Sequence, residues 1–576
     1  MDKNNLAKKR INQWLEGPYD EQTKNQIKFL MQKNPKELTD CFSQTLHFGT
    51  GGIRAKLGIG TNRLNIYTIA AAAQALCNYI IKQNEENPSV IIGFDNRKNS
   101  NLFAQICAKV IAANNIKAYL FKELRPTPLV SFGCRYKKCI AAIMITASHN
   151  PKDYNGYKVY WKDGGQVLPP HDISIIDEYN KIHSYSNVKI LDSVDHPLIE
   201  IITTEIDTAY IDSVFAMDLF NKKIENTSLK IIYSNMHGTG LTLIPQCLKK
   251  LGFENITIVK EQESFDPEFT NAPNPNPEEM QALEIGINYL IKDNADIFIS
   301  NDPDADRMGI VININGEKKI LSGNEIASIM LDYLCKTSTL QIKSACVKSI
   351  VTTELLSKIC LRYEIKCIDV LTGFKYICQK INEWDKNEAH KFLFGAEESL
   401  GFLIETFVRD KDAVTASLLI AKIADSAKKQ NKTLLDLLHD IYSTYGIYRE
   451  GNFSFAFEDS SKMKILMHNL RKNPLKTISN LTVSYIDDFQ SQESINLTDN
   501  SKNKINLPPS NVLRFRLNDK SEITIRPSGT EPKLKIYAET SRLNIKNIQE
   551  DIKICDMHLN ALIDAIKLQI NNLLGI

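Results

Sequence analysis

Apolar and polar positions along this chain form two kinds of segment. Short runs of consecutive apolar residues predict buried strands, at residues 90–94, 140–145, 229–233, 297–300 and 348–351. Longer stretches with helical character lie between these runs. Strands that alternate with helices are typical of βαβ units, so the pattern predicts an α/β protein with mixed, largely parallel sheets.

Two segments depart from that alternation. Residues 310–320 predict a β-hairpin that turns at Asn315-Gly316, because Asn-Gly fits the tight turn of a two-residue hairpin loop. The polar segment 491–506 predicts a mobile surface insertion without chemistry. The whole chain of 576 residues is too long for one hydrophobic core, and its length predicts about three to five domains.

Composition narrows the class of protein. The chain has 70 basic and 68 acidic residues and a net charge of +2, so we expect no general attraction to nucleic acid or membrane surfaces. Residues 1–14 are polar, and no segment approaches the roughly 20 apolar residues of a membrane span, which predicts a cytoplasmic protein. The 12 cysteines form no Cys-x-x-Cys pair, which favours reduced core thiols over zinc ligands or disulfides.

One hydroxyl stands where an apolar strand meets a turn. The sequence Thr-Ala-Ser-His-Asn-Pro at 146–151 follows the predicted strand 140–145, so Ser148 is expected at a strand end, where α/β enzymes place their chemistry. The glycines of a serine hydrolase elbow are missing, since Thr146 and Asn150 occupy their positions. A turn without chemistry is the alternative interpretation.

A second loop, Asn-Asp-Pro-Asp-Ala-Asp-Arg at 301–307, follows the predicted strand 297–300. Its three carboxylates, Asp302, Asp304 and Asp306, repel one another unless a cation neutralises them, and carboxylate oxygens suit Mg²⁺. An EF-hand is excluded, because the positions for its glycine and its last glutamate hold Arg307 and Asn313. The loop therefore predicts a metal site, with a solvated acidic turn as the alternative.

These two loops belong to a set of seven motifs, and the set resembles the α-D-phosphohexomutase superfamily, the phosphoglucomutases and phosphomannomutases, in family order along nearly the whole chain. The form is most similar to longer bacterial phosphoglucomutases and to the related phosphopentomutases and glucose-bisphosphate synthases. The motifs are FGTGGIR at 48–54, GTNRLN at 60–65, TASHNP at 146–151, NDPDADR at 301–307, LTGFK at 371–375, GAEESLG at 395–401 and RPSGTEPK at 526–533.

The resemblance implies four domains. Three are α/β domains, which carry in turn the phosphoserine loop, the metal loop and the sugar-binding loop, and the fourth is a C-terminal α+β lid that binds phosphate. The expected boundaries lie at residues 1–205, 206–320, 321–440 and 441–576. The hairpin at 310–320 would then close the second domain or begin the third.

The resemblance also implies a phosphoserine mechanism. Ser148 is phosphorylated in the active enzyme and gives its phosphoryl group to a phosphosugar, which produces a sugar 1,6-bisphosphate that also acts as activator. One Mg²⁺ per chain is held by a phosphate oxygen on Ser148 and by Asp302, Asp304 and Asp306, which suits a reaction dominated by positioning and charge neutralisation. Arg54 and Arg307 would share the charge of the transferring group, unless either forms an ordinary surface ion pair.

Proton transfer needs a base near the accepting hydroxyl and an acid near the leaving oxygen. Lys158 matches a family lysine with that role. The second group is open, because Gly401 and Phe402 stand where some family members carry a histidine. Lys411 aligns with the lysine of phosphoglucomutases that lack the histidine, and His149 is another candidate that would otherwise bind phosphate or backbone.

Substrate contacts are implied in the last three motifs. Glu397 and Ser399 suit two neighbouring sugar hydroxyls, and Lys375 belongs to the third domain's motif. The C-terminal segment supplies a guanidinium, hydroxyls and open backbone for a phosphate group, although a plain turn is the alternative. Its candidate residues are Arg526, Ser528, Gly529, Thr530 and Lys535.

The sequence thus predicts an enzyme that interconverts hexose 1-phosphate and hexose 6-phosphate, with glucose as the expected sugar. Phosphomannomutase and phosphopentomutase activities are alternatives that share the motifs. A regulator that binds phosphosugars without turnover is disfavoured because binding needs no nucleophile, and a phosphatase is disfavoured because it needs no second phosphate site at Arg526. The pattern does not specify an oligomeric state.

Overall fold

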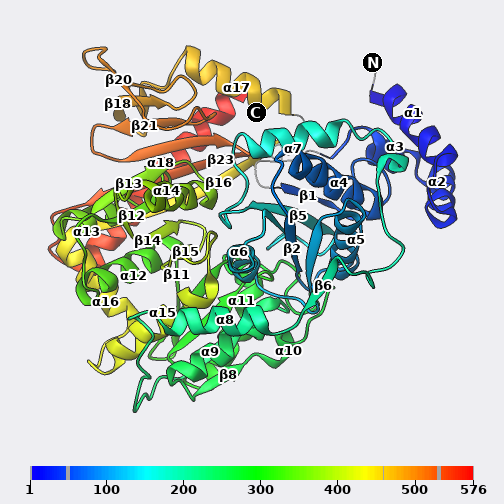
Figure 1. Ribbon diagram of the computed structural model, residues 1–576. Helices are drawn as coiled ribbons and strands as arrows, with labels where there is room; N and C mark the ends of the chain where they lie inside the picture. The colour runs from blue at the N-terminus through cyan, green and yellow to red at the C-terminus, as the bar shows by residue number, and fades with distance from the viewer. Residues whose placement is uncertain (1–2, 47–51, 458–459, 529–532, 575–576) are drawn as a thin grey trace. The chain divides into compact units, whose positions relative to one another are not determined.

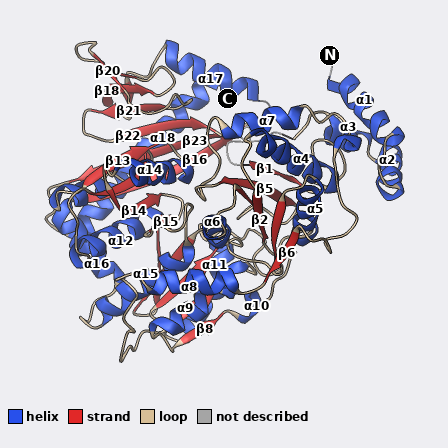
Figure 2. Ribbon diagram, in the orientation of Figure 1, coloured by secondary structure: helices blue, strands red, loops and turns tan. Residues whose placement is uncertain are grey.

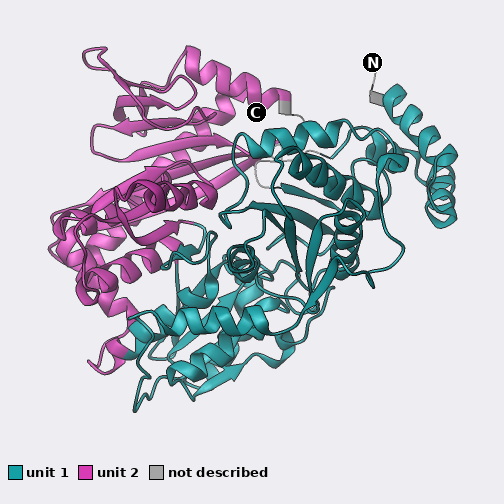
Figure 3. Ribbon diagram, in the orientation of Figure 1, with its two compact units in different colours: residues 1–321, 399–425 teal, residues 322–398, 426–576 magenta. Residues whose placement is uncertain are grey.

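The computed structural model describes residues 3–46, 52–457, 460–528 and 533–574 (Figure 1). The chain forms two compact units (Figure 3). Unit 1 contains Met1–Leu321 and Ser399–Asp425, and unit 2 contains Ser322–Glu398 and Ser426–Ile576. Among the described residues, no helix combines the length and the apolar character that a membrane span needs.

Unit 1 begins with a small helical layer. Helices α1, α2 and α3 pack around the indole of Trp14, whose ring stacks on Tyr19 with 4.2 Å between centroids. Asp20 caps α2, because its carboxylate accepts a hydrogen bond from the backbone N–H of Thr23 at 2.7 Å. The helices are α1 (Lys3–Glu16), α2 (Glu21–Lys33) and α3 (Pro35–Phe42).

The first sheet has six strands in the order β1-β5-β4-β2-β3-β6. Strands β4, β2, β3 and β6 run parallel, whereas β5 is antiparallel to both β4 and β1. The strands are β1 (Gly52–Lys56), β2 (Ser89–Phe94), β3 (Lys117–Phe121), β4 (Ala141–Ile145), β5 (Tyr154–Trp161) and β6 (Ile199–Ile202). Its helices are α4 (Ile66–Lys82), α5 (Ser100–Ala113), α6 (Thr127–Tyr136) and α7 (His171–Asn180).

A second sheet of unit 1 has the order β11-β10-β9-β7-β8, with β9, β7 and β8 parallel. The predicted hairpin is confirmed, since β10 pairs with β11 around Asn315 and Gly316, both with positive φ. The strands are β7 (Ile231–Ser234), β8 (Ile256–Ile258), β9 (Ile297–Asn301), β10 (Met308–Ile314) and β11 (Glu317–Leu321), and the helices are α8 (Glu205–Phe215), α9 (Ile244–Leu251), α10 (Lys260–Glu263) and α11 (Met280–Lys292). The short strand β15 (Gly401–Leu403) and most of α15 (Ala413–Lys428) complete the unit.

Unit 2 contains three parallel strands in the order β13-β12-β14. The strand predicted at 348–351 begins and ends earlier, at Ser344 and Ser349. Lys348 is buried within it and pairs with Glu354 and Asp369. The strands are β12 (Ser344–Ser349), β13 (Lys366–Val370) and β14 (Lys391–Glu397), with helices α12 (Gly323–Thr337), α13 (Leu355–Arg362), α14 (Phe374–Asn387) and α16 (Leu434–Tyr445).

The C-terminal sheet of unit 2 is antiparallel, in the order β16-β23-β22-β21-β18-β19-β20, and α17 and α18 supply side chains to its apolar core. Residues 491–506 are not the irregular insertion that their polarity predicts, because β19 and β20 pair there from Glu493 opposite Lys504. The elements are β16 (Ile447–Ala456), β17 (Thr477–Ile478), β18 (Leu481–Asp488), β19 (Glu493–Asn496), β20 (Lys502–Lys504), β21 (Leu513–Leu517), β22 (Glu522–Pro527), β23 (Lys533–Arg542), α17 (Ser460–Lys472) and α18 (Ile548–Leu574).

Three sheets with parallel strands and one antiparallel sheet with helices confirm the predicted α/β fold with an α+β C-terminal part (Figure 2). In the first sheet, α5 packs against β2 and β3, and α6 packs against β2 and β4. The central strand β4 is buried along its whole length. The loop after β4 therefore starts from a rigid position, as a catalytic loop requires.

Candidate active site

Ser148 lies three residues beyond the end of β4 and is 1% exposed. Its backbone has φ +51°, a left-handed conformation that few residues other than glycine adopt. The side chain of Thr146 stabilises this turn, because its Oγ1 accepts a hydrogen bond from the Ser148 N–H at 2.8 Å. The turn aims the Ser148 hydroxyl at the second loop, and Oγ donates to Asp302 Oδ2 at 2.6 Å.

A buried arginine holds the rest of this loop. The Arg97 guanidinium donates to the backbone carbonyls of Ser148, Asn150, Pro151 and Tyr154, with distances of 2.9 Å to Pro151 and 3.0 Å to Tyr154. Arg97 Nε lies 3.4 Å from a carboxylate oxygen of Asp95, and both side chains are fully buried. One planar group thus binds four carbonyls that no regular strand satisfies.

The aspartate loop follows β9 and folds around Asp302. Its Oδ1 accepts hydrogen bonds from the backbone N–H groups of Asp306 at 3.1 Å and Arg307 at 3.0 Å. The loop also packs closely on Gly238, where a Cβ would lie 2.2 Å from the Cα of Pro303. A side chain at position 238 would therefore displace the aspartates.

The other two aspartates are paired with lysines. Lys158 Nζ donates to Asp304 at 2.7 Å and to Asp306 at 3.1 Å, and Lys411 Nζ lies 3.4 Å from Asp306. Thr127, at the start of α6, donates its hydroxyl to Asp304 Oδ2 at 2.7 Å. These contacts bring residues from five separate parts of unit 1 to one buried polar centre.

Burial and charge set opposite protonation preferences within the triad. Burial, together with the charges of Asp306 and Asp304, raises the pKa of Asp302 well above its ordinary value. Burial also opposes ionisation of Asp304 and Asp306, but the Lys158 ammonium and hydrogen bonds, joined for Asp306 by the charges of Lys411 and Arg307, together lower the pKa of both carboxyl groups. These two carboxylates in turn raise the pKa of Lys158 against the effect of its own burial.

The triad fits a hard cation. Ligand oxygens of Asp302, Asp304 and Asp306 all lie within 4.8 Å of one another. The Oδ1 atoms of Asp304 and Asp306 are buried and have no hydrogen-bond partner in the described part of the chain. Buried carboxylate oxygens without a hydrogen bond are costly, so two of them in one cluster of aspartates, which also contacts the Ser148 hydroxyl, suit a bound metal ion.

Three further predicted residues lie at this centre. His149 Nδ1 is 3.1 Å from Ser148 Oγ, and burial followed by the charges of Arg307 and Arg54 lowers the pKa of His149 well below its ordinary value. Arg54, on β1, donates to the Asn150 side chain at 3.2 Å. Arg307 lies 3.5 Å from the Glu278 carboxylate. The imidazole is thus neutral at neutral pH, whereas the two guanidinium groups supply positive charge.

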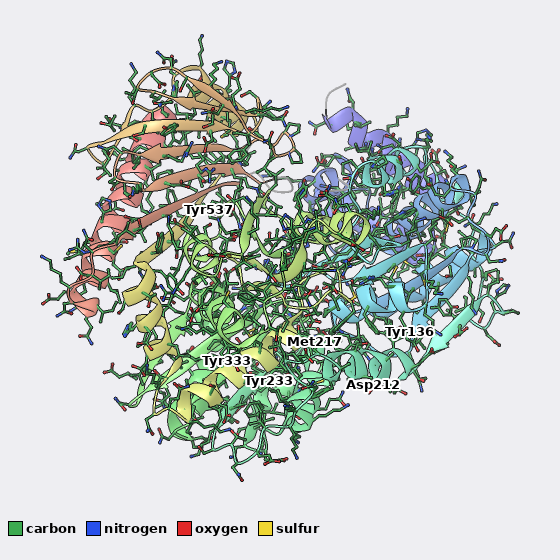
Figure 4. All side chains as sticks on the ribbon, turned by 60° about the vertical axis from the view of Figure 1, so that its left-hand side comes forward. Tyr136, Asp212, Met217, Tyr233, Tyr333 and Tyr537 are labelled. Carbon is green, nitrogen blue, oxygen red and sulfur yellow. The ribbon has the colours of Figure 1, made fainter. Side chains whose placement is uncertain are left out.

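Unit 2 gathers a separate set of predicted residues. Glu397, at the end of β14, accepts a hydrogen bond from the Gly373 N–H at 2.7 Å. Arg526 on β22 faces Lys535 on β23 as its strand partner. Tyr537 on β23, labelled in Figure 4, connects the two groups, because burial and the charges of Glu398 and Glu397 raise its pKa while Arg526 lowers it. The ends of β14 and β22 therefore face a common polar region.

The other predicted residues of the last three motifs have few contacts that define their position. Lys375 is buried at the start of α14, with Nζ 5.2 Å from the ring centroid of Tyr376. Ser399 lies in the turn between β14 and β15. Ser528 donates its N–H to the Lys533 carbonyl at 2.7 Å. Gly529 and Thr530, and residues 48–51 of the first motif, lie outside the described residues.

Sequence reasoning missed three residues that position this centre. Arg97 and Thr127 carry no motif of their own, and only the folded chain shows that they bind the serine loop and Asp304. Asp410 accepts hydrogen bonds from the Lys411 backbone at 2.8 Å and from the Tyr160 hydroxyl at 2.8 Å, which orients Lys411. The one available signal was the Asp-Lys-Asp run at 410–412, where charges follow a buried strand.

A buried hydroxyl beside a carboxylate triad and two ammonium groups, on an α/β scaffold, defines a phosphoryl-transfer enzyme. Four family models agree in order along the chain, and the chain belongs to the phosphoglucomutase/phosphomannomutase family. The models are alpha/beta/alpha domain I at residues 45–186, domain II at 208–315, domain III at 322–445 and the C-terminal domain at 491–553.

Curated relatives support the same assignment, and solved structures share the fold. A phosphoglucomutase of Staphylococcus haemolyticus is 38% identical over 89% of this chain and 93% of its own length. A phosphoglucomutase of Staphylococcus aureus is 36% identical over 94% and 97%. The fold is similar to that of the phosphoglucomutase parafusin from Paramecium, with a TM-score of 0.68, 19% identity and coverage of 92% and 97%. A phosphoglucomutase/phosphomannomutase family protein from Burkholderia thailandensis gives a TM-score of 0.66 at 16% identity, over 92% and 97%. The chain is thus an isomerase of the hexose phosphate mutase type.

Proposed function

We propose that this enzyme interconverts glucose 1-phosphate and glucose 6-phosphate through a phosphoserine at Ser148 and a glucose 1,6-bisphosphate intermediate. The observation that carries the proposal is the Ser148 hydroxyl, buried at the end of β4 and bonded to Asp302 at 2.6 Å. A hydroxyl in this position has carboxylates, lysines and arginines around it, which is what a transferring phosphoryl group requires.

The reaction conserves phosphate over two transfers. In the first, the sugar hydroxyl attacks the phosphorus, the bond between phosphorus and Ser148 Oγ breaks, and the proton of the sugar hydroxyl goes to a protein base. In the second, Ser148 Oγ gives up its proton and attacks the other phosphate of the bisphosphate, the bond between that phosphorus and the sugar oxygen breaks, a protein acid protonates the leaving sugar oxygen, and phosphoserine is regenerated. Lys158 is our candidate for the proton steps, and the contacts of its Nζ with Asp304 at 2.7 Å and Asp306 at 3.1 Å, in the same buried centre as Ser148, support this choice.

We assign the second proton-transfer role to Lys411 rather than to His149. Lys411 Nζ lies 3.3 Å from Asp410 and 3.4 Å from Asp306, so its proton is held between two carboxylates. His149 is neutral and its Nδ1 faces Ser148 Oγ. It is therefore placed to hydrogen-bond the serine or its phosphate, which is a positioning role.

Mg²⁺ is the cation that we propose for the aspartate triad, with Asp302, Asp304, Asp306 and a Ser148 phosphate oxygen as its ligands. When bound, it would neutralise charge on the transferring group. The buried Oδ1 atoms of Asp304 and Asp306, which have no hydrogen-bond partner among the described residues, support this proposal. Exhaustive chelation should abolish turnover, and Asp304→Asn should lower kcat and weaken the Mg²⁺ dependence. Full activity after chelation would assign the triad a structural role.

Substrate recognition is assigned to residues of the last three motifs. Glu397 and Ser399 would bind neighbouring sugar hydroxyls and Lys375 would add positive charge, while Arg526, Ser528, Gly529, Thr530 and Lys535 would bind the phosphate that is not reacting. The Arg526–Lys535 strand pair supports the second assignment, since it places two cationic side chains on the same face. We propose the four domains 1–205, 206–320, 321–440 and 441–576, and the separate sheets within these ranges support them.

Two experiments test the function. Wild-type enzyme with Mg²⁺ and a trace of the matching bisphosphate is given hexose 1-phosphates and pentose 1-phosphates, and the 6- or 5-phosphate product is measured. Glucose 1-phosphate should give the highest kcat/KM, and a preference for mannose or a pentose would replace glucose by that sugar. Ser148→Ala should keep its fold and lose turnover. A fall in kcat of about tenfold or less, which corresponds to a barrier change of only about 1.4 kcal/mol, would not fit loss of the nucleophile.

A further inference from the structure

Three cysteines of unit 2 lie together although they are scattered in the sequence. Cys346 is on β12, Cys360 is on α13 and Cys367 is on β13, and their Sγ atoms all lie within 4.8 Å of one another. These elements are neighbours in Figure 1, where β13 pairs with β12 and α13 packs against β13. We call these three residues the thiol cluster.

The βαβ topology explains how the cluster forms. Cys346 and Cys367 are direct partners in the parallel pair β12–β13, so their side chains point to the same face of the sheet. Helix α13 connects the two strands and lies over that face, and Cys360 is on its last turn. Three consecutive elements therefore each contribute one thiol to a single point.

The surroundings of the cluster are polar on one side. Ser357, on α13, donates its hydroxyl to Cys367 Sγ at 3.6 Å. Lys348 follows Cys346 by two positions and shares its face of β12, with its ammonium 2.8 Å from Glu354 and 2.9 Å from Asp369. Cys346 and Cys360 are buried, whereas Cys367 is partly exposed and gives the cluster access to solvent.

Buried cysteines do not ordinarily have to lie next to one another. A buried free cysteine normally packs as a small hydrophobic residue, and nine other cysteines of this chain are buried outside the cluster. The cluster differs from them because three sulfurs face one another instead of facing apolar side chains. Tetrahedral zinc–sulfur bonds of about 2.3 Å place sulfur atoms about 3.8 Å apart, so small side-chain rotations would bring these sulfurs to coordination distance.

We propose that Cys346, Cys360 and Cys367 form a binding site for a thiophilic d¹⁰ cation, Cu⁺ or Zn²⁺. Each thiol that binds loses one proton to solvent, so three M–S bonds release three protons and no electron is transferred. Cu⁺ is satisfied by three sulfurs, whereas Zn²⁺ takes a fourth ligand from the Ser357 hydroxyl or from water at the partly exposed Cys367. The site is distinct from the aspartate triad, whose oxygen ligands select hard cations.

The first experiment identifies the donor atoms in the full-length enzyme after complete reduction and removal of metal. Co²⁺, a spectroscopic substitute for Zn²⁺, should give near-ultraviolet thiolate-to-metal charge-transfer absorption at one equivalent, which oxygen ligands of the triad cannot produce. Cu⁺ is titrated separately in competition with a Cu⁺ chelator. Binding in the Cu⁺ arm alone identifies a three-sulfur copper site, and binding in both arms identifies a site that also accepts Zn²⁺.

The variants assign the site to these residues. Cys346→Ser, Cys360→Ser and Cys367→Ser should each remove the charge-transfer band and weaken cation binding at least about tenfold. Cys555→Ser is the matched control, since Cys555 is an equally buried thiol on α18 of the same unit, and it should bind like the wild type. Far-ultraviolet circular dichroism checks the fold, and Cys367→Ala replaces any serine variant that does not fold.

Three outcomes would overturn the proposal. They are no binding by the reduced wild-type enzyme in either the Co²⁺ or the Cu⁺ arm, equal binding by wild type and Cys367→Ser, or formation of a disulfide within the cluster in place of metal binding. Mutase activity is measured in parallel, and it should persist in the cysteine variants because none of these residues belongs to the phosphoryl-transfer site. A failure of the cation site would therefore leave the proposed function untouched.

Discussion

Arg97→Met is the most informative perturbation of the catalytic loop. Methionine keeps much of the length of the side chain, but it removes the charge and every donor. The four carbonyls of the loop that includes Ser148 then lose their shared partner, and Asp95 keeps a buried carboxyl with no guanidinium beside it. The substitution therefore acts on loop position and on buried charge together.

The two effects have different magnitudes. Removing one partner of a buried ion pair typically costs about 3–5 kcal/mol of stability, and we expect a loss of this size. Burial already raises the pKa of Asp95, so protonation of that carboxyl sets an upper limit to the loss. Displacement of a catalytic group by about 1 Å costs about a hundredfold in rate, and we expect kcat to fall at least that far.

A double variant separates these effects. Asp95→Asn combined with Arg97→Met removes the uncompensated charge, so stability should recover in part, but the serine loop stays unsupported and kcat should stay low. Arg449→Met in unit 2 is the control, because Arg449 also lies between two carboxylates, at 2.8 Å from Glu325 and 2.6 Å from Asp556. It should lower stability without lowering kcat.

Turnover is measured by coupling glucose 6-phosphate formation to NADPH production, at a temperature where all variants are folded by circular dichroism. Stability is measured from the first unfolding transition in urea. The reasoning is refuted if Arg97→Met loses stability but keeps kcat within about tenfold of wild type, since loop position would then not depend on the arginine. Recovery of kcat in the double variant would refute it equally.

Three other perturbations test the electrostatics. Lys158→Met should lower kcat at least about a hundredfold, the loss expected for a general acid or base, and pH–rate profiles should show a shifted limb. Thr127→Val removes the 2.7 Å hydrogen bond to Asp304 and should raise the metal concentration needed for half-maximal activity, which a Mg²⁺ titration measures. Glu539 faces Glu450 across β16 and β23, and burial with the charge of Glu450 raises the pKa of Glu539 well above its ordinary 4.5. The folded state therefore loses stability as pH rises above about 4.5, where the unfolded chain releases this proton. Glu539→Gln should accordingly raise the melting temperature at pH 8 more than at pH 4.5. An equal change at both pH values would contradict the raised pKa of Glu539.

The residues that could be predicted from sequence are those whose chemistry is local. Ser148 follows an apolar strand and precedes Asn-Pro, and the three aspartates repel one another within five residues, so each loop is informative alone. The presence of the five predicted strands, though not all of their ends, and the Asn315-Gly316 hairpin were likewise visible because their signals are short-range. Local patterning was sufficient there because burial and turn formation act on neighbouring residues.

The residues that could not be predicted act over long sequence separations. Arg97 reaches a loop about fifty residues away, and Thr127 reaches Asp304 on another sheet. The predicted boundary of β12 was also misplaced, and the buried Lys348 within this strand is tolerated only through Glu354 and Asp369, partners that the strand itself does not contain. The thiol cluster had no sequence signal at all, since its spacing is set by the length of a helix and its loops.

The left-handed backbone conformation of Ser148 bears on which residue evolution would keep at position 148. A residue with a side chain pays about 1–2 kcal/mol for this conformation, whereas glycine adopts it freely. In the mechanism that we propose, turnover requires a hydroxyl at a position where glycine would favour the stability of the fold. In a descendant that only binds sugar phosphates, we expect glycine at position 148. Such a protein should be more thermally stable than the same chain with serine at this position.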